Sequence, residues 1–426
     1  MLKIRKINRS VNPFSGINFC IDEIRKARIP ELIDYLLPPR PKQSTYSYSD
    51  VILGLIYANL CGSERLEDIK KIKDEFRGIP DLHIPSPDTI ANTLKFLSSE
   101  TVDVTSDSDI EHQFNLNEPL NMLLLKIVTR LNILNKSKNV LDYDNVTIPT
   151  EKYDSKFTYK QFRGYSPGVA FIGQLPVFIE GRNGNSPAAY KMVDTLKRCL
   201  KELDQQNIPI KRFRSDSAAF QKSVMLLMDN KGIEFFIRAQ ENESIGASYS
   251  TVEWKPVVIN GERFEVGSIK YSPIDVSRVY RLVVYKCLDR ENKETNRHTG
   301  DNYSVLSIIT NDWKMSNTEI IKFYDQRGAA EKNFSMLLND FNWKRMPFSF
   351  LSQNVTFLVT EAIASVIYRH VINTISKKVS FVNRTFQLKK FIFQFISVAG
   401  YWTYEGGEFI LNLHTDRKYQ QGEPPG

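Results

Sequence analysis

The strongest constraint on the fold is the order of strand-like and helix-like segments that begins near residue 139. Three segments rich in β-branched and aromatic residues come first, separated by polar turns: NVLDYDNVTI, FTYKQFRGYS and VAFIGQLPVFIEGR. Helical patterns then alternate with short strands: AAYKMVDTLKRCLKELDQQ, IKRFRSDS, FQKSVMLLMDNKG and IEFFIRA. Three strands followed by helix, strand, helix and strand predict an α/β domain with a mixed sheet.

This is the order that a ribonuclease H-like mixed sheet flanked by helices requires, and such a sheet needs one further helix. β-like runs such as RFEVGSIKYS, VYRLVVYKCL and YSVLSIITND precede the next long helical pattern, SNTEIIKFYDQRGAAEKNFSMLLNDF, and therefore predict a β-rich insertion. We expect a helical N-terminal region at 1–136 and the first part of the α/β domain at 137–239. The insertion follows at 240–314, the last helix of the domain with the C-terminal helices at 315–400, and a tail at 401–426.

Helical patterns also occur near both ends of the chain. The first, YSYSDVILGLIYANL, ends just before Gly62, which interrupts the helical pattern. A later helix is expected in IPSPDTIANTLKFLSS, with Ser86 or Asp88 as its N-cap. These segments resemble a helix-turn-helix, and an ordinary helical hairpin is the alternative. The remaining expectations are a loop at 105–117, helices at 355–376 and 385–397, and a disordered tail at 417–426.

Composition and charge restrict the partners. The 426 residues, of which 42% are hydrophobic, are enough to bury a sizeable core. A net charge of +8 favours a polyanionic partner, although many basic proteins bind no nucleic acid. The four cysteines form no CxxC pair, so neither a zinc site nor a disulfide framework is indicated. No segment approaches the roughly eighteen uncharged apolar residues of a membrane span, and we expect a cytoplasmic protein without membrane contact.

Acidic residues interrupt two of the expected strands. Asp142 and Asp144 are two residues apart in an apolar strand, so they point to the same face of the sheet. A buried carboxylate needs a cation or hydrogen-bond donors. Asp216 ends a second strand, where a side chain reaches the carboxyl edge of the sheet. The alternative is that Asp216 or Ser217 caps the following helix.

A polar stripe marks the long helical pattern after the insertion. Tyr324, Arg327 and Glu331 lie at positions i, i+3 and i+7, and therefore on one face of a helix. Such a face is either solvated and carries an Arg–Glu ion pair, or lines a polar cleft. Acids on the first strand, on a neighbouring strand and on this helix converge on one point, and converging carboxylates suit Mg²⁺ or Mn²⁺.

Three motifs surround these acids: LDYDNVT, FRSDSAAF and FYDQRGAAEKNF. In this order they resemble the bacterial insertion-sequence transposases with a DDE catalytic domain, in particular the group with a β-rich insertion before the last acid. The last motif is similar to that family's Tyr-x-x-Arg-x-x-x-Glu stretch, and the resemblance covers most of the chain. Asp144 and Asp216 are 72 residues apart and Asp216 and Glu331 are 115 apart, which leaves room for the insertion in the second interval.

The resemblance implies a metal site. Asp144, Asp216 and Glu331 are expected to be catalytic and to hold Mg²⁺, for which Mn²⁺ substitutes. We choose Asp144 rather than Asp142 as the ligand that bridges two ions, because it is nearer the end of the strand and matches the second acid of the family's Asp-x-Asp pattern. Tyr324 and Arg327 are expected to contact a phosphate of the transposon end. Pairing of Arg327 with Glu331 is the alternative.

The resemblance also implies contacts with DNA elsewhere. Four basic side chains are expected along the DNA path, or else on a merely solvated surface: Arg212, Arg214, Lys344 and Arg345. Trp254 is expected to stack on an unpaired base. Burial under the inserted sheet is the alternative for this side chain.

The expected function is that of a DNA transposase that cuts and joins strands at the terminal inverted repeats of an insertion sequence. Its partners would be double-stranded DNA, at the transposon ends and at the target, and a second copy of the chain in the synaptic complex. Its place would be the bacterial cytoplasm, associated with the nucleoid. The alternatives are a metal-dependent nuclease of the same fold without strand transfer, and an inactive DNA-binding protein descended from a transposase.

Overall fold

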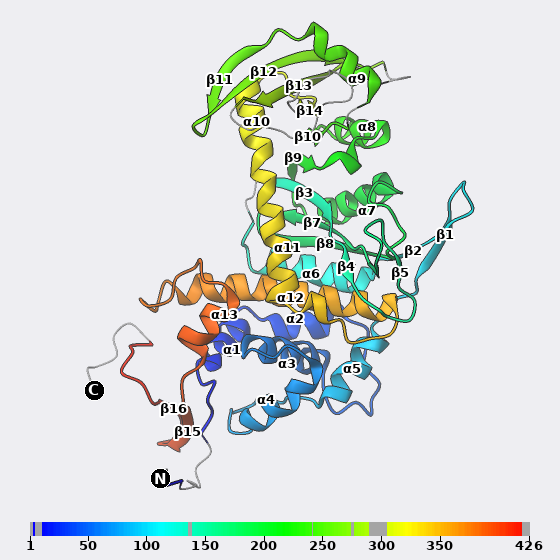
Figure 1. The fold of residues 1–426 in the computed structure, drawn as a ribbon. Coiled ribbons are helices and arrows are strands. Elements are labelled where there is room, and N and C mark those ends of the chain that lie inside the picture. The colour runs from blue at the N-terminus through cyan, green and yellow to red at the C-terminus, as the bar shows by residue number, and fades with distance from the viewer. Residues whose placement is uncertain are drawn as a thin grey trace. The chain divides into compact units, whose positions relative to one another are not determined.

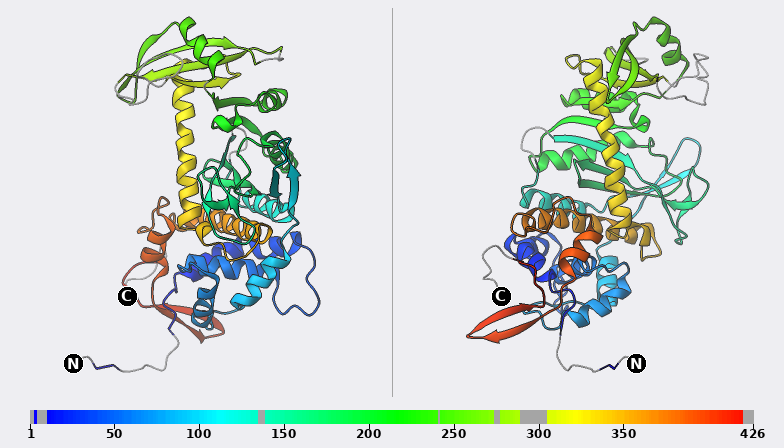
Figure 2. Two further views of the ribbon diagram at one scale, coloured as in Figure 1. Left: turned by 45° about the vertical axis from the view of Figure 1, so that its right-hand side comes forward. Right: turned by 60° about the vertical axis from the view of Figure 1, so that its left-hand side comes forward.

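The computed structural model describes residues 3–4, 11–134, 139–240, 242–273, 277–288 and 305–419 (Figures 1 and 2). The chain folds into two compact units, each built from discontinuous segments. Unit 1 contains Met1–Ile133, Ile148–Lys156 and Ser335–Gly426, and unit 2 contains Leu134–Thr147 and Phe157–Phe334. The segments expected from the sequence at the two ends of the chain therefore belong to the same unit.

Unit 1 is mainly helical. Its helices are α1 (Ile17–Lys26), α2 (Ile29–Leu36), α3 (Tyr48–Leu60), α4 (Ile69–Glu75), α5 (Pro87–Phe96), α6 (Glu118–Arg130), α12 (Leu351–Ile375) and α13 (Leu388–Phe391), the last followed by a π-helical turn at Ile392–Ile396. Its strands are β1 (Val102–Thr105), β2 (Glu111–Asn115), β4 (Ile148–Pro149), β15 (Gly400–Glu405) and β16 (Glu408–Leu413). The sequence correctly predicts that Ser86 caps a helix, since its side chain accepts a hydrogen bond from the Thr89 N–H of α5.

The central helix α12 packs against α1, α3, α5 and α6. By length and composition it is the one helix among the described residues that would be able to cross a membrane, although Glu361 and Arg369 interrupt its apolar sequence. However, 89% of its most apolar 18-residue window is buried inside the protein, as expected for a core helix.

A buried carboxylic acid lies in the middle of α12. Glu361 is fully buried, and the Asn59 side chain donates a 2.6 Å hydrogen bond to one of its oxygens. Asn342 in turn donates to the Asn59 side-chain oxygen at 3.1 Å. Burial raises the pKa of Glu361 to about 8. The group is therefore neutral near pH 7, and it connects α3 with α12 through a short polar network.

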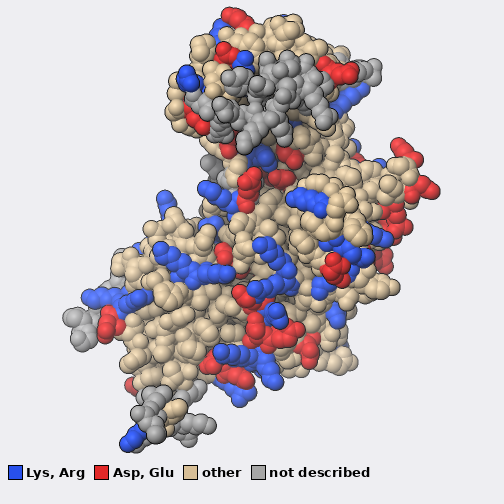
Figure 3. Space-filling model, in the orientation of Figure 1, with Lys and Arg blue, Asp and Glu red and all other residues tan. Residues whose placement is uncertain are grey.

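Two expectations for unit 1 are wrong in detail, and a third region has more regular structure than was expected. The segment expected as a loop at 105–117 contains β2 and the turn of an antiparallel β1–β2 hairpin, which carries the red side chains at the right-hand edge of Figure 3. The expected tail contains the β15–β16 hairpin. Tyr419 is buried, and its hydroxyl donates to the Phe395 carbonyl, so the expected disorder does not begin at residue 417. Residues 420–426 lie outside the described residues.

The helix-turn-helix expectation gains no support. The segment between α4 and α5 runs from Phe76 to Ser86, which is longer than the roughly three- or four-residue turn of that motif. Both helices pack against α3 instead.

Unit 2 is built on a mixed sheet. Its strands are β3 (Asn139–Asn145), β6 (Arg163–Tyr165), β7 (Gly168–Ile172), β8 (Leu175–Arg182), β9 (Ile210–Ser215), β10 (Glu234–Arg238), β11 (Lys255–Ile259), β12 (Glu262–Tyr271), β13 (Tyr280–Cys287) and β14 (Leu306–Thr310), with the short β5 (Lys156–Phe157) at the boundary. Its helices are α7 (Met192–Gln205), α8 (Lys222–Asn230), α9 (Glu243–Ser248) and α10 (Asn317–Asp325).

The strand directions confirm the expected α/β fold. The strands follow the order β8-β7-β3-β9-β10-β14-β13-β12-β11. The first three form an antiparallel meander, and β9 and β10 then add in parallel to β3. Helices flank this sheet, as expected for a ribonuclease H-like domain (Figure 2). The inserted strands β11–β14 extend the same sheet through the antiparallel β10–β14 pair.

The long helix after the insertion is interrupted. The sequence predicts one continuous helix, but a 3₁₀ turn at Gln326–Gly328 separates α10 from α11 (Ala329–Asn339). α10 packs against β10–β13, with Ile320, Ile321 and Tyr324 in an apolar cluster. A 3₁₀ segment inside a helix changes the angle between successive side chains and commonly marks a strained or functional position.

The Glu361 carboxyl makes stability depend on pH. Because its pKa is higher in the folded protein than in the unfolded chain, the folded state binds more protons between about pH 4.5 and 8, and the free energy of unfolding falls as pH rises through this window. Glu361→Gln keeps the shape and removes the titration. We expect the variant to gain stability relative to the wild type by up to about 1.4 kcal/mol per pH unit, measured by urea unfolding at several pH values. If the difference in the free energy of unfolding between the variant and the wild type did not change with pH, Glu361 would not be a buried neutral acid.

Candidate active site

The pairing of β3 with β9 determines where the two strand acids lie. The strands are parallel, with Asp142 opposite Arg214 and Tyr143 opposite Ser215. One step further along the same register, Asp144 on β3 meets Asp216 directly after β9. Asp142 and Asp144 share a face of the sheet, as the alternation rule predicts. The two acids at the carboxyl edge are therefore neighbours because of backbone pairing.

Asp142 is a structural acid. The Arg214 guanidinium binds both of its oxygens, at 2.7 and 2.8 Å, and both side chains are buried. Burial raises the pKa of Asp142, and Arg214 opposes this effect. Arg214 also donates to the Phe323 carbonyl at 2.6 Å. The structure therefore does not support the expected DNA contact of Arg214, because its guanidinium is committed to the core.

Asp144 has a different environment, with 21% of its side chain exposed. Burial and then the charge of Asp216 raise its pKa to about 6, while Arg327 lowers it. Arg327 donates to one carboxylate oxygen at 2.9 Å, and the Asn145 N–H donates to the other at 2.8 Å. Asp144 is thus an acid whose ionised form is poorly compensated by the protein.

Asp216 agrees with both interpretations of its position, as a cap of the following turn and as a member of an acidic pair. Its carboxylate accepts the Ala218 N–H at 3.0 Å and so caps the short 3₁₀ turn at Ser217–Ala219. At the same time its charge acts on Asp144. Local capping and membership of an acidic pair therefore hold together.

Two members of the expected polar stripe remain neighbours across the start of the 3₁₀ turn, because the Arg327 guanidinium lies 5.8 Å from the centre of the Tyr324 ring. Tyr324 is buried, and its hydroxyl donates to the Ser215 carbonyl at 3.3 Å, so it is not presented to DNA as expected. Arg327 is partly exposed, and its ion pair joins it to Asp144 rather than to Glu331.

Glu331 is exposed in the first turn of α11. The inward face of α11 is set by Phe334, whose ring meets Phe171 at 5.2 Å, and by Asn333, which donates to the Gly173 carbonyl at 2.8 Å. At 100° per residue, Glu331 lies about 200° from Asn333 and about 60° from Phe334, so it stands beside the inward face rather than within it. Within the described part of the chain, no three His, Cys, Asp or Glu side chains are grouped closely enough to hold a metal ion.

Two of the three expected metal ligands fit a divalent cation. Asp144 and Asp216 supply carboxylate oxygens, which are the donors that Mg²⁺ and Mn²⁺ prefer. Their mutual repulsion would be relieved by a shared cation. The Arg327 guanidinium already provides one positive charge at Asp144, which shows that this carboxylate accepts a cationic partner.

The other expected DNA contacts lie in both units. In unit 2, Arg212 pairs with Glu234 at 2.8 Å, and the partly buried Trp254 has the Lys286 ammonium 4.8 Å from the centre of its ring. In unit 1, the exposed Lys344 donates to Asn339, and the exposed Arg345 pairs with Glu64. These contacts do not test whether the four side chains bind DNA, so that role stays a prediction.

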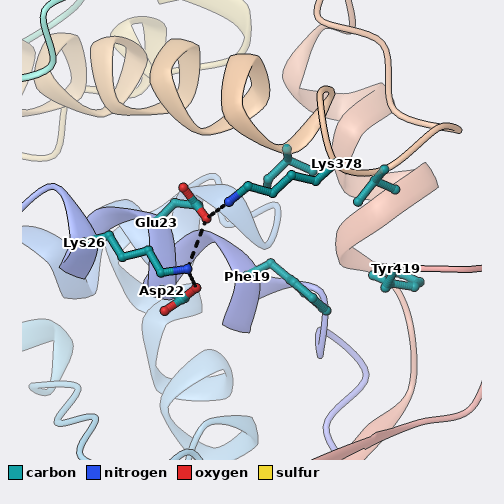
Figure 4. A pocket seen from close by; sticks show the side chains of 8 residues that line it. Phe19, Asp22, Glu23, Lys26, Lys378 and Tyr419 are labelled. Carbon is teal, nitrogen blue, oxygen red and sulfur yellow. Dashed lines mark hydrogen bonds and ion pairs between the residues drawn. The ribbon is translucent and has the colours of Figure 1, made fainter. Parts of the chain in front are cut away.

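A cavity of about 320 Å³ in unit 1 lies between the end of α12, α1 and Tyr419 (Figure 4). Lys378 and Lys26 both reach Glu23, and Lys26 also pairs with Asp22, while Phe19 and Tyr419 add aromatic walls. The two positive and two negative charges compensate one another. This cavity therefore does not favour a phosphate.

Sequence reasoning missed a buried ion pair on β8. Arg182 is fully buried and pairs with Glu180 at 3.1 Å, while Arg198 binds the second Glu180 oxygen. The available signal was two charged residues, two positions apart, in the apolar strand LPVFIEGR. The pair stabilises the loop that follows β8, at the same sheet edge as Asp144.

Because the two β3 acids, Asp142 and Asp144, have different environments, we expect the same change from Asp to Asn to have opposite effects on stability at the two positions. Asp142→Asn removes the charge that balances the buried Arg214, and we expect it to destabilise unit 2 by about 3 kcal/mol. Asp144→Asn should be at least as stable as the wild type above pH 6, because ionisation of Asp144 weakens the fold as pH rises from about 4 to 6. Thermal unfolding at pH 7 checks both. Equal losses would contradict the assignment of Asp142 to the core.

The family model described as "Transposase DDE domain group 1" matches residues 25–421. No curated protein sequence matches the chain. Among solved structures, a cryo-EM structure of a piggyBac transposase synaptic complex with hairpin DNA has 10% sequence identity and a TM-score of 0.42, covering 91% of this chain and 80% of that chain. Because the family model covers nearly the whole sequence, the chain belongs to the group 1 family of transposases with a DDE domain.

Proposed function

We propose that this transposase cuts DNA at the terminal inverted repeats of an insertion sequence and joins the freed strand to a target. The observation that carries the proposal is the pair Asp144 and Asp216, held side by side at the carboxyl ends of two parallel strands in a chain of this family. Each acid comes from a different strand, so the pairing depends on the fold and not on a local motif.

In this proposal Asp144, Asp216 and Glu331 hold Mg²⁺ or Mn²⁺. When bound, two such ions activate the attacking water or 3′-hydroxyl and stabilise the leaving oxygen. Asp144 is the shared ligand because it is central and electrostatically strained. Glu331 would complete the set after α11 shifts at the 3₁₀ turn that precedes it. Arg327, partly exposed beside Asp144, would bind a phosphate of the incoming strand through a charge-assisted hydrogen bond.

The proposed partners are duplex DNA and a second copy of the chain. The net charge of +8 favours contact with phosphates, and cutting two ends in one event requires two active sites. The basic side chains Arg212, Lys344 and Arg345, and the ring of Trp254, remain candidates for DNA contacts outside the centre.

The test of the proposal is cleavage of a labelled duplex that carries one end of the element encoding this chain, with a supercoiled plasmid as target. We expect nicking and strand transfer in Mg²⁺ or Mn²⁺ and neither in EDTA. Asp144→Asn, Asp216→Asn and Glu331→Gln should each lower cleavage by on the order of 10³-fold or more while DNA binding in Ca²⁺ persists. Asp204→Asn, at an exposed acid on α7, is the matched control.

Each outcome of this assay separates the candidate functions. Cleavage without strand transfer would favour a nuclease of the same fold. Binding without cleavage by the wild type would favour an inactive DNA-binding protein. Undiminished cleavage by the Asp144 and Asp216 variants, or in EDTA, would contradict the metal site.

The ion pair of Arg327 predicts competition with the metal ion. Without DNA, the guanidinium holds the same carboxylate that the ion needs. We therefore expect Arg327→Gln to bind Mn²⁺ more tightly by on the order of tenfold, which corresponds to about 1.4 kcal/mol. The Mn²⁺ dependence of the melting temperature measures this without turnover. Arg278→Gln, which removes an ion pair with Asp229 elsewhere in unit 2, is the control. Unchanged or weaker Mn²⁺ binding would refute the competition.

A further inference from the structure

The loop that follows β8 reaches the same edge of the sheet as the acidic pair. β7 runs antiparallel to β3, and β8 runs antiparallel to β7, so β8 has the direction of β3 and β9. The carboxyl ends of these three strands therefore lie at one edge, where ligands of α/β sheets bind. The segment 183–191 leaves β8 at this edge and leads into α7.

Arg182 fixes the conformation of this loop through hydrogen bonds to its backbone carbonyls. Its fully buried guanidinium donates to the carbonyls of Pro187, Ala188 and Tyr190 at 3.2, 3.2 and 2.9 Å. Glu180 balances its charge inside the core. All three carbonyls face one guanidinium nitrogen, Nη1, so a single buried donor group holds them in one arrangement and the loop is pre-organised.

A second contact joins this loop to the turn that carries Asp216. The Gln221 side chain donates to the Ala189 carbonyl at 2.9 Å and to the Ala218 carbonyl at 2.7 Å. Ala218 is also the residue whose N–H binds the Asp216 carboxylate. The loop after β8 and the turn after β9 therefore form one continuous surface beside Asp216.

Two exposed lysines flank this junction. Lys191 lies two residues after Ala189, and Lys222 follows Gln221 directly. In the part of the chain that the structure describes, Lys191 makes no ion pair with an acid, and Asp194 one turn away is 3.7 Å from Lys197 instead. The loop also contains the Ser186 hydroxyl, which is buried and has no hydrogen-bond partner among the described residues. Positive charge at the junction of these two segments, one of which carries Asp216, suits a phosphodiester strand that approaches the acidic pair.

We propose that Lys191 and Lys222 each bind a phosphate of the DNA strand that enters the Asp144–Asp216 site. Arg182 and Gln221 are positioning residues that hold the two loops at a fixed separation. The inference rests on the proposed function and adds a contact surface on the Asp216 side of the centre. Lysine suits this task, since its ammonium binds a phosphate as a point charge without a required orientation.

The salt dependence of DNA binding tests the proposal. The full-length protein would be titrated in Ca²⁺ with the duplex that carries the element's end. A double variant, Lys191→Ala with Lys222→Ala, should reduce the slope of log affinity against log salt by about 1.8, since each phosphate contact contributes roughly 0.9. The control is Lys197→Ala with Lys201→Ala, which removes the same charge from the exposed side of α7. The control should leave the slope near that of the wild type.

A crosslink tests the position of the strand independently. Ala189 is exposed, so Ala189→Cys accepts a photoreactive maleimide, and Lys201→Cys on α7 serves as the control site. Cys20, Cys61 and Cys199 are buried, and Cys287→Ser removes the remaining, partly buried thiol. We expect DNA crosslinks from position 189 and few from position 201.

The outcomes distinguish a failure of the proposed function from a failure of the phosphate contacts of Lys191 and Lys222. If the wild type does not bind the end duplex, the proposed function fails and this inference fails with it. If the wild type binds and cleaves, but both double variants change the slope equally or position 189 gives no crosslink, only the inference is overturned.

Discussion

The buried ion pair between Asp142 and Arg214 is the interaction on which the candidate site depends. It joins β3 to β9 at one fixed step of their parallel pairing. A slip of one residue would turn the acid at the end of β3 to the opposite face of the sheet. Asp144 and Asp216 meet only in the observed register. A desolvated ion pair contributes little net stability, but it strongly penalises every register that leaves one charge unpaired.

Two aspartates on one strand, two residues apart, thus have opposite roles because their partners differ. Asp142 has a bidentate partner inside the core, and its charge is compensated in the folded protein. Asp144 has a repelling neighbour and a single contact from Arg327, which comes from a more distant part of the chain. A poorly compensated carboxylate at a sheet edge gains most from binding a cation. The same local sequence therefore supplies both a structural ion pair and the candidate metal ligand.

The sequence was sufficient for the fold, because the strand and helix periods between residues 139 and 239 are long and unambiguous. It also located Asp144 and Asp216 correctly at strand ends. It was insufficient where a partner lies far along the chain: nothing near Arg214 indicates its pairing with Asp142, and nothing near Arg327 indicates Asp144. The stripe at Tyr324, Arg327 and Glu331 held only for its first two members, because helical periodicity assumes a regular helix, whereas a 3₁₀ turn lies between Tyr324 and Glu331. The β1–β2 hairpin was missed because its strands are short and polar.

The charges at the carboxyl edge suggest why DNA and metal ions would bind together in the proposed function. Asp144 and Asp216 repel each other, and the guanidinium of Arg327 partly offsets this repulsion. A metal ion alone must compete with that guanidinium, and a phosphate alone meets the negative pair. When both arrive, the phosphate offers Arg327 a new partner and the ion takes its place at the carboxylates. Each ligand then favours the other by the same coupling free energy, as linkage requires. In the proposed function, such a site would favour the complex that contains both ligands, and strand cutting would be confined to that complex.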